Sequence, residues 1–427
     1  MKVFRRSLSI AISLFSLLPV TACKSTAQSS EMLEASGPDD FVRVDPSNPS
    51  KLIYKGSEYR FSAANSYSML NSKASADKQF AQMKELGVNA LRMWGFWNGG
   101  SDSLQPSRGV FTESRWKQFD YVISKAAEEK IKIILPLANY WDEFGGIVLL
   151  NSWVGHPPES KEYFDREIFY RNDKSKKLYQ EYVMQILNRR NSITGKLYKD
   201  DPTILMWEPM NEARGRSDPS GQTVVDWLTW ASKLIKDNAP KQLVGTGTEG
   251  FFKSHSKYSY YPWQAANPPT ARRNGRTENP VPEGSYFDLD CKIPTIDICS
   301  IHAWPFQWFI EPADRPDLFM SQWVEEHIAT AKDFKKPLYL AEFGWQIQRS
   351  EGEKAMEMRA KVFEAAYFDK SKGSNQVRDG IAGIGFWNIS DNDNPNPGGL
   401  TFEVTCPKDQ NVCSLIKAFS KAQVLSR

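Results

Sequence analysis

Histidine and cysteine are scarce in this sequence of 427 residues, which holds four His and five Cys. The spacings of these residues fit no zinc-binding pattern. Neither a P-loop nor a dinucleotide-binding fingerprint occurs along the chain. We therefore expect no metal centre and no cofactor.

An excess of charge of one sign is also lacking, because 54 Lys and Arg face 51 Asp and Glu, for a formal net charge of +3. Lys2, Arg5 and Arg6 supply this excess within the first 22 residues, which contain no acidic residue. The rest of the chain is neutral overall. A neutral chain has no basic field to attract a nucleic acid, so we expect no nucleic-acid partner.

Long hydrophobic runs are missing too. The apolar run over residues 7–20 is shorter than the roughly 20 residues that a bilayer-spanning helix needs, but it suits a secretory signal. It ends in Val20-Thr21-Ala22-Cys23, which resembles the lipobox of bacterial lipoproteins, whose cysteine is acylated. We predict a lipoprotein signal peptide over residues 1–22, lipidation at Cys23 and a flexible polar tether over residues 23–40. An ordinary signal peptide with Cys23 incidental is the alternative.

The other four cysteines, Cys291, Cys299, Cys406 and Cys413, form an even set. Export to an oxidising compartment permits two disulfides. Of the three possible connectivities, the short-range pairs 291–299 and 406–413 are the simplest. Free buried thiols are the alternative.

Eight short apolar, β-branched runs follow one another between residues 59 and 390. They cover residues 59–65, 88–96, 132–139, 204–212, 243–250, 297–305, 337–345 and 381–390. Segments with helical periodicity lie between them, at 77–86, 115–130, 175–190, 223–238, 321–334 and 353–368. This alternation predicts one domain over residues 41–427, a (β/α)8 TIM barrel with enlarged loops at its C-terminal face. A doubly wound open sheet is the alternative.

Polar and aromatic side chains gather where these predicted strands end, and aromatic residues make up 13% of the chain. In a barrel of this type the chemistry lies at the C-terminal ends of the strands. The strand-end residues are Asn65 and Tyr67, Arg92 and Trp94, Trp141, Asn211 and Glu212, Glu249, His302 and Trp304, Glu342, and Trp387. Carboxylates among aromatic rings indicate a polar cleft with sugar-stacking walls.

A pair of carboxylates is the minimum apparatus of glycoside hydrolysis, and Glu212 and Glu342 end predicted strands 4 and 7. Across a barrel mouth they can lie about 5–5.5 Å apart, the separation of a retaining enzyme. The two groups need different pKa values. We expect Arg92 to hold Glu342 ionised and a more apolar setting to keep Glu212 protonated.

The strand-end motifs resemble those of glycoside hydrolase family 5, and their finer strings resemble its mannan-degrading subfamily. The resemblance runs from about residue 41 to the end of the chain. It rests on LRMWGF (91–96), YKDDPTI (198–204), WEPMNEAR (207–214), EGF (249–251) and EFG (342–344), with His302 and Trp387 in the family's order.

This resemblance implies that Glu212 is the acid/base and Glu342 the nucleophile, oriented by Arg92. It further implies that Asn211 binds the 2-hydroxyl of the sugar being cleaved. His302 would line the site, Trp387 would form the floor of the −1 subsite, and Trp94 and Trp141 would be cleft walls. For Glu249 a subsite contact and a structural role in the loop remain open.

Two positions depart from the family pattern. The tyrosine that usually follows the histidine by two residues, and touches the nucleophile, is Trp304 here, whose indole can only donate. The proline that usually follows the acid/base is Ala213. The first departure puts the support of the nucleophile in question.

We therefore predict a monomeric, exported cell-envelope lipoprotein, or a secreted protein, that cleaves β-1,4-mannan internally with retention. A long aromatic segment over residues 252–295 is expected to set the mode of cleavage. The alternatives are an exo-acting β-mannosidase, a β-1,4-glucan hydrolase of the same family and a non-catalytic glycan-binding lipoprotein.

Overall fold

The computed structural model describes residues 37, 40–157, 163–253, 271–273, 276–278, 283–308, 315–369, 371, 376–391, 399–406 and 408–425. The predicted signal peptide, Cys23 and all but two residues of the predicted tether lie outside this part of the chain. Four aromatic residues of the predicted segment 252–295, Tyr258, Tyr260, Tyr261 and Trp263, also lie outside it.

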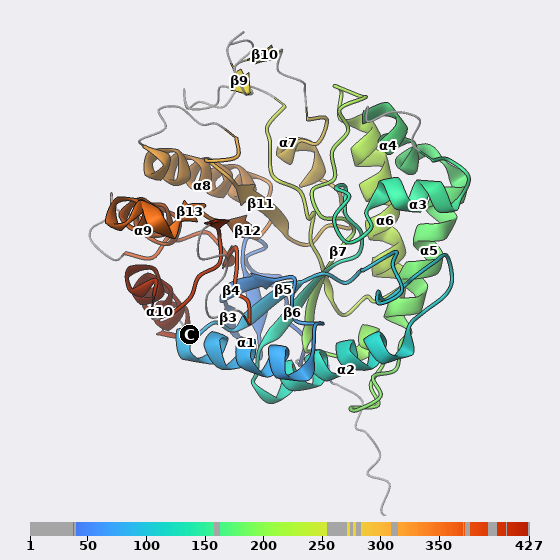
Figure 1. Cartoon of the computed structure of the whole chain (residues 1–427), viewed down its shortest axis with the longest axis horizontal. Coiled ribbons are helices and arrows are strands. Elements are labelled where there is room, and N and C mark those ends of the chain that lie inside the picture. Colours follow the sequence, from blue (N-terminus) through green and yellow to red (C-terminus); the bar gives the residue numbers. More distant parts are fainter. Residues whose placement is uncertain are drawn as a thin grey trace, which may run out of the picture. The chain divides into compact units, whose positions relative to one another are not determined.

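Eight parallel strands form the central sheet, one within each predicted run (Figure 1). They are β4 (Phe61–Ser66), β5 (Ala90–Met93), β6 (Lys132–Pro136), β7 (Ile204–Glu208), β8 (Leu243–Val244), β11 (Cys299–Ala303), β12 (Leu338–Phe343) and β14 (Gly383–Phe386). The order is β11-β12-β14-β4-β5-β6-β7-β8. A parallel bridge between Gly245 and Ile298, with the Asp297 amide donating to the Val244 carbonyl oxygen at 2.8 Å, closes the barrel. The predicted (β/α)8 fold is confirmed.

Helices surround these strands (Figure 1). Six occupy the predicted segments: α1 (Lys73–Leu86), α2 (Glu113–Glu128), α5 (Asp173–Leu187), α6 (Gln222–Asn238), α8 (Pro316–Asp333) and α9 (Glu353–Tyr367). In α1 the Ser72 hydroxyl caps the first turn by accepting from the Ser75 amide, and Gly87 ends the helix with a φ of 70°. Phe80, Met83 and Leu86 form an apolar stripe along this helix and are buried. Among the described residues no helix combines the length and apolar character needed to cross a bilayer.

Further elements were not predicted. Antiparallel strands β1 (Arg43–Val44), β2 (Leu52–Tyr54) and β3 (Ser57–Tyr59) pack with Phe61, Ile134 and Tyr339 in a core cluster at the N-terminal end of the barrel. Insertions after strands 3 and 5 carry α3 (Ile147–Trp153), α4 (Tyr163–Arg171), β9 (Ala271–Arg273), β10 (Arg276–Glu278) and α7 (Phe287–Asp290). The short elements η2 (Tyr198–Asp200), β13 (Ile347–Gln348), η3 (Arg349–Glu351) and β15 (Leu400–Thr401) lie in other connections. The insertions are the enlarged loops of the barrel.

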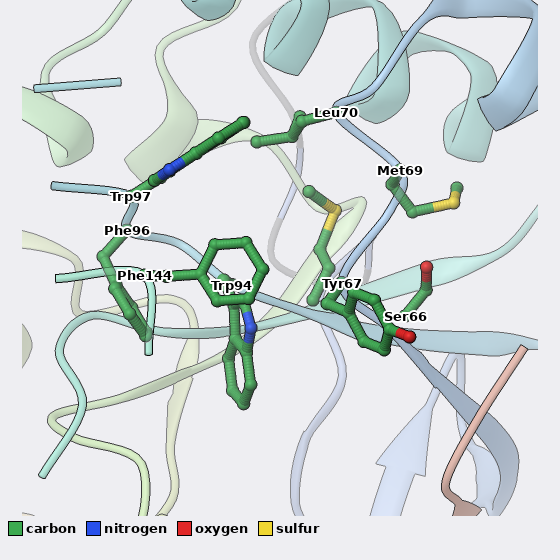
Figure 2. A pocket seen from close by; sticks show the side chains of 9 residues that line it. Ser66, Tyr67, Met69, Leu70, Trp94, Phe96, Trp97 and Phe144 are labelled. Carbon is green, nitrogen blue, oxygen red and sulfur yellow. The ribbon is translucent and has the colours of Figure 1, made fainter. Parts of the chain in front are cut away.

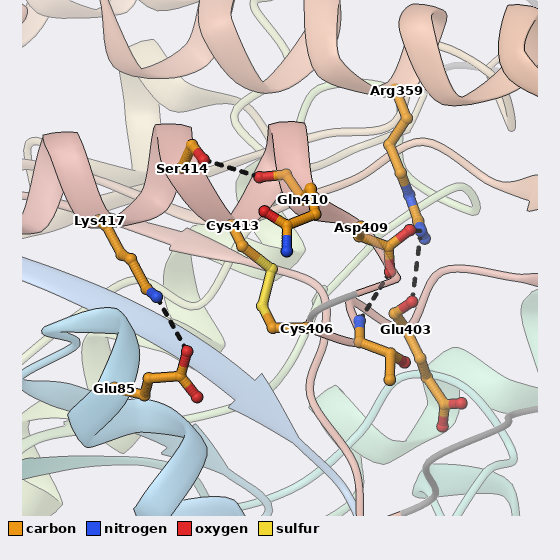
Figure 3. Close-up of a disulfide and its surroundings, with 10 residues drawn as sticks. Glu85, Arg359, Glu403, Cys406, Asp409, Gln410, Cys413, Ser414 and Lys417 are labelled. Atoms are coloured by element: carbon orange, nitrogen blue, oxygen red, sulfur yellow. Dashed lines mark hydrogen bonds and ion pairs between the residues drawn. A yellow bond between two sulfur atoms is a disulfide. The ribbon is translucent and has the colours of Figure 1, made fainter.

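The structure contains both short-range disulfides, Cys291–Cys299 and Cys406–Cys413. The first links α7 to the start of β11, and the second links the connection after β14 to the last helix, α10 (Gln410–Leu425). Figure 3 shows the second, together with the ion pair that joins Lys417 of α10 to Glu85 of α1 at 2.9 Å. These links fasten the loops after strands 5 and 8 to the barrel wall.

Arg359 of α9 ties together the loops that follow strands 7 and 8. Its buried guanidinium donates to the carbonyl oxygens of Trp345, Thr401 and Glu403 at 3.1–3.3 Å. It also pairs with Asp409 at 3.3 Å (Figure 3). One buried cation thus holds two loops that flank the strand ends carrying Glu342 and Trp387.

Candidate active site

A buried guanidinium supports the floor of the site. Arg92 on β5 donates from Nε and Nη2 to one oxygen of Glu208 at 3.0 and 2.8 Å, and from Nη2 to Asn211 Oδ1 at 2.8 Å. Its Nη1 donates to Glu342 Oε1. Arg92 and Glu208 are both inaccessible to solvent. The arginine therefore holds Glu342 in place.

The two predicted catalytic carboxylates lie side by side with one imidazole. His302 Nδ1 lies 2.6 Å from Glu212 Oε1 and 3.5 Å from Glu342 Oε2. One oxygen of each carboxylate and one ring nitrogen lie within 4.8 Å of one another. This spacing fits the carboxylate separation of about 5–5.5 Å in retaining glycosidases and not the 6.5–9.5 Å of inverting ones.

Glu212 reaches the site because the chain bends after strand β7. The predicted run 204–212 is a strand only as far as Glu208, so Glu208 and Glu212 do not share one strand. Glu212 adopts a left-handed φ of 52°. Its amide donates to the Gly247 carbonyl oxygen, and the Asn211 amide donates to that of Ala138, both at 2.8 Å. The neighbouring strand ends thus impose a backbone conformation that costs about 1–2 kcal/mol for a residue with a Cβ.

Burial raises the pKa of both Glu212 and Glu342. On Glu342 the effect of burial is opposed by His302 and Arg92, and on Glu212 it is opposed by Arg214 and Trp141. Two charged carboxylates this close repel each other, so each raises the pKa of the other and a single proton on the pair is favoured. Because Arg92 hydrogen-bonds Glu342 directly, it favours the ionised form of Glu342 and therefore the protonated form of Glu212.

The surroundings of His302 favour its neutral form. Burial lowers the pKa of its ring, and the charge of Arg92 lowers it further, against the opposing effect of Glu342. A neutral imidazole beside Glu212 allows that carboxyl to carry a proton. A protonated Glu212 beside an ionised Glu342 is the pair that double displacement at an acetal carbon requires.

The indole of Trp141 is a contact of the acid/base and not only a cleft wall. Its Nε1 donates to Glu212 Oε2 at 2.5 Å. The Arg214 guanidinium lies 4.8 Å from the Trp141 ring centroid. Arg214 in turn donates to both oxygens of Glu249 at 2.6 and 2.5 Å and to Glu283 at 2.7 Å. Burial raises the pKa of Glu249 to about 7, although Arg214 opposes this.

Aromatic rings cover the opposite side of the site. Trp387 lies partly exposed between Tyr67, Trp94 and Trp304, with ring centroids 5.8–6.1 Å apart. Figure 2 shows the adjoining hollow, which Tyr67 and Trp94 line. Its other lining residues are Ser66, Met69, Leu70, Met93, Phe96, Trp97 and Phe144. Trp94 itself is 9% exposed, so the rings open to a ligand are mainly Tyr67, which is 40% exposed, and Trp387.

Trp304 does not take the place of the expected tyrosine beside the nucleophile. Its indole instead lowers the pKa of Glu212. Its ring meets Trp387 and Phe402 edge-on, with centroids 6.1 and 5.3 Å apart. Among the described residues, Glu342 pairs with the side chains of Arg92 and His302. The departure in sequence is therefore a change in how the two carboxylates are supported.

Sequence reasoning named Asn65 only as a strand-end residue and missed the other residues of the site described below. Asn65 donates to the Ala341 carbonyl oxygen at 2.8 Å and accepts from Arg92 at 3.3 Å. Asn139 accepts from the side chain of Asn211 at 3.1 Å. Arg214 is the last residue of the motif WEPMNEAR (207–214), which could have indicated it as a site residue. Glu283 follows a stretch without helical or strand periodicity, and no sequence motif indicated that it belongs to the site.

Glu212, His302 and Glu342 are also the one group of metal-ligating type found within the described residues. Their oxygens already face N–H donors from Arg92 and Trp141. A cation at this point would displace the arginine from the nucleophile. We assign these side chains to proton transfer and nucleophilic attack.

Comparison with known proteins agrees with this geometry. The family model described as GH family 5 beta-mannosidase-like matches residues 39–266. The chain belongs to glycoside hydrolase family 5. This family 5 hydrolase is 32% identical over 315 residues to mannan endo-1,4-beta-mannosidase 7 of Arabidopsis thaliana. The aligned region covers 73% of the chain and 68% of that relative.

Solved structures resemble the family 5 hydrolase over most of its length. The endo-beta-1,4-mannanase from Thermotoga petrophila is 29% identical and superposes with a TM-score of 0.71 over 86% of the chain and 77% of its own. The endo-1,4-beta-mannanase from Rhizomucor miehei is 25% identical, with a TM-score of 0.71 over 90% of the chain and 99% of its own.

Proposed function

We propose that this chain is a retaining endo-β-1,4-mannanase. The observation that carries the proposal is the carboxylate pair, Glu212 and Glu342, held within 4.8 Å by Arg92 and His302. The curated relative and the two solved structures named above supply the substrate class, since each is described as acting on β-1,4-mannan.

The reaction proceeds in two displacements. Glu342 attacks the anomeric carbon as the bond to the leaving oxygen breaks, and Glu212 gives its proton to that oxygen. Glu212, now ionised, then takes a proton from water, whose oxygen attacks the same carbon and releases Glu342. Two inversions return the sugar to its original β configuration.

The surrounding side chains fit the binding of a sugar at this point. Trp387 offers a partly exposed ring beside the carboxylates, as expected for the floor of the −1 subsite. Asn211 lies against Arg92 and Asn139, which fix its amide beneath the site, where it would meet the 2-hydroxyl. The hollow beside Tyr67 continues the aromatic surface away from the carboxylates (Figure 2).

Internal cleavage is tested by following galactomannan viscosity against reducing ends released. We expect a steep fall in viscosity after few cuts, and mixed manno-oligosaccharides as early products. Linear mannan and cellulose run in parallel test the substrate class, and we expect little release from cellulose. Release of free mannose from the first minutes with nearly constant viscosity would instead show an exo-acting β-mannosidase. Cleavage of cellulose faster than cleavage of mannan would show a glucanase.

We also propose that the enzyme is exported and anchored to the cell envelope through a lipid on Cys23. The support is the order of basic residues 1–6, the apolar run 7–20 and the string Val20-Thr21-Ala22-Cys23. In a bacterial host that processes lipoproteins, Cys23→Ser should move the protein from the membrane fraction to the soluble fraction or leave it unprocessed. A membrane fraction unchanged by this substitution would point to another anchor.

A further inference from the structure

Glu283 lies at the end of the long connection after strand 5, and it meets the segment that follows the acid/base. Its carboxylate is 6% exposed. One oxygen accepts from Arg214 Nη1 at 2.7 Å and from Arg216 Nε at 2.8 Å, and the other from Arg216 Nη2 at 3.1 Å. Glu283 is therefore a buried counter-ion shared by two arginines just beyond Glu212.

The backbone fixes this meeting point. The Gly215 amide donates to the Glu283 carbonyl oxygen at 2.8 Å. Gly284 has a φ of 64°, and a Cβ built there would lie 1.9 Å from the Gly215 carbonyl oxygen. Only glycine fits such a close approach. The two segments therefore abut, and the Glu283 carboxylate has little freedom to move away from Arg214.

Arg214 connects Glu283 to the acid/base. Its guanidinium lies over the Trp141 ring, and the Trp141 N–H donates to Glu212. Its positive charge also stabilises the ionised form of Glu212 and so lowers the pKa of that group, against the effect of burial. How strongly the cation acts on Glu212 depends on the carboxylates that neutralise it, and these are Glu249 and Glu283.

We propose that Glu283 is a positioning residue for the general acid. It holds Arg214 on the Trp141 ring and offsets its charge, so that Glu212 keeps its proton at the working pH. The proposal rests on the proposed function, because it takes Glu212 as the proton donor. Glu283 itself touches neither substrate nor the reacting atoms.

The charges around Glu212 determine whether Glu283→Gln raises or lowers the pKa of Glu212. The charged or titratable groups that face it are Arg92, Arg214, Glu249, His302 and Glu342. Glu283→Gln keeps the shape of the side chain but removes a negative charge beside Arg214. The less compensated arginine then favours the ionised form of Glu212, so that the proton donor is lost at lower pH.

The experiment compares pH profiles of kcat/KM on soluble mannan. For Glu283→Gln we expect the alkaline limb to move down by about 0.5–1 pH unit, a shift typical of one charge nearby, with the acidic limb little changed. Arg214→Met removes the cation and should move the alkaline limb up. In the double variant the effect of Glu283→Gln should vanish, because its only route to Glu212 is then missing.

Glu167→Gln is the matched control. Glu167 of α4 is 1% exposed and accepts from the Arg216 and Ser217 amides at 2.7 and 2.8 Å, so it fastens the same segment without contacting Arg214. If Glu283 only anchors the loop, both Gln variants lose activity alike and keep the wild-type pH profile.

An unshifted or raised alkaline limb in Glu283→Gln, or a shift that persists in the double variant, overturns the proposal. Should Glu283→Gln unfold, which circular dichroism reports, Glu283→Asp and Arg214→Met decide the question. The aspartate keeps the charge and should keep the wild-type limb. Failure of the proposed function looks different, since the wild-type enzyme would then not release oligosaccharides from mannan at all.

Discussion

Glu342→Ala is expected to lower kcat on mannan by at least about 10⁴-fold, because it deletes the nucleophile and with it the first displacement. The protein should stay folded and bind manno-oligosaccharides. Arg92 keeps Glu208 and Asn211 as hydrogen-bond partners after the substitution, so its buried charge is not left without a partner. Burial disfavours the charge of Glu342, as the raised pKa shows, and the alanine removes that charge. We therefore expect a free energy of unfolding equal to that of the wild type or higher.

Kinetics, circular dichroism and binding isotherms check this expectation. Glu357→Ala is the control, an exposed carboxylate on α9, and it should behave as the wild type. Activity of Glu342→Ala within tenfold of the wild type would refute its role as nucleophile. NMR of fresh wild-type products should show the β-anomer first, and an initial α-anomer would contradict the double displacement.

Glu212→Ala is expected to lower hydrolysis of mannan by about 10³-fold or more, because a sugar leaving group needs a proton. An aryl β-mannoside with an acidic phenol leaves without that help, so its glycosylation step should be nearly retained and the glycosyl-enzyme should accumulate. The alkaline limb of the pH profile should disappear, because deprotonation of Glu212 causes it.

Sodium azide separates the roles of the two carboxylates. In Glu212→Ala a small anion fits the space left by the side chain, attacks the glycosyl-enzyme and should give β-mannosyl azide. In Glu342→Ala azide attacks the free face of the substrate directly and should give α-mannosyl azide. If the two variants gave the opposite anomers, the assignments of Glu212 and Glu342 would be exchanged.

Much of the barrel could be predicted because strand and helix patterns are local. The apolar residues Phe80, Met83 and Leu86 lie within a single helix, so local sequence periodicity is enough to reveal them. Each of the eight apolar runs overlaps one observed strand. Strands β1, β2 and β3 have two or three residues each and carry no alternation that a sequence pattern could reveal. They form because their apolar side chains pack against the N-terminal end of the completed barrel.

The carboxylate pair was predictable for a topological reason. Parallel strands bring all their C-terminal ends to one face, so residues that end strands 4 and 7 must meet there, however far apart they lie in the chain. Arg92 and His302 follow from the same rule. The sequence by itself therefore determined the barrel, the face that bears the site, and the two carboxylates with their cation.

Only the tertiary structure determined which side chains of the site form hydrogen bonds and ion pairs with one another. Arg92 divides its donors between Glu208 and Glu342. Trp141 and His302 both contact Glu212, and Glu283 reaches Arg214 from another loop. These contacts join side chains from different loops and strands. They depend on rotamers and on the bend after Glu208 that no local pattern encodes. Because such contacts and the burial around them set proton affinities, the pKa values of Glu212 and Glu342 are a property of the folded chain.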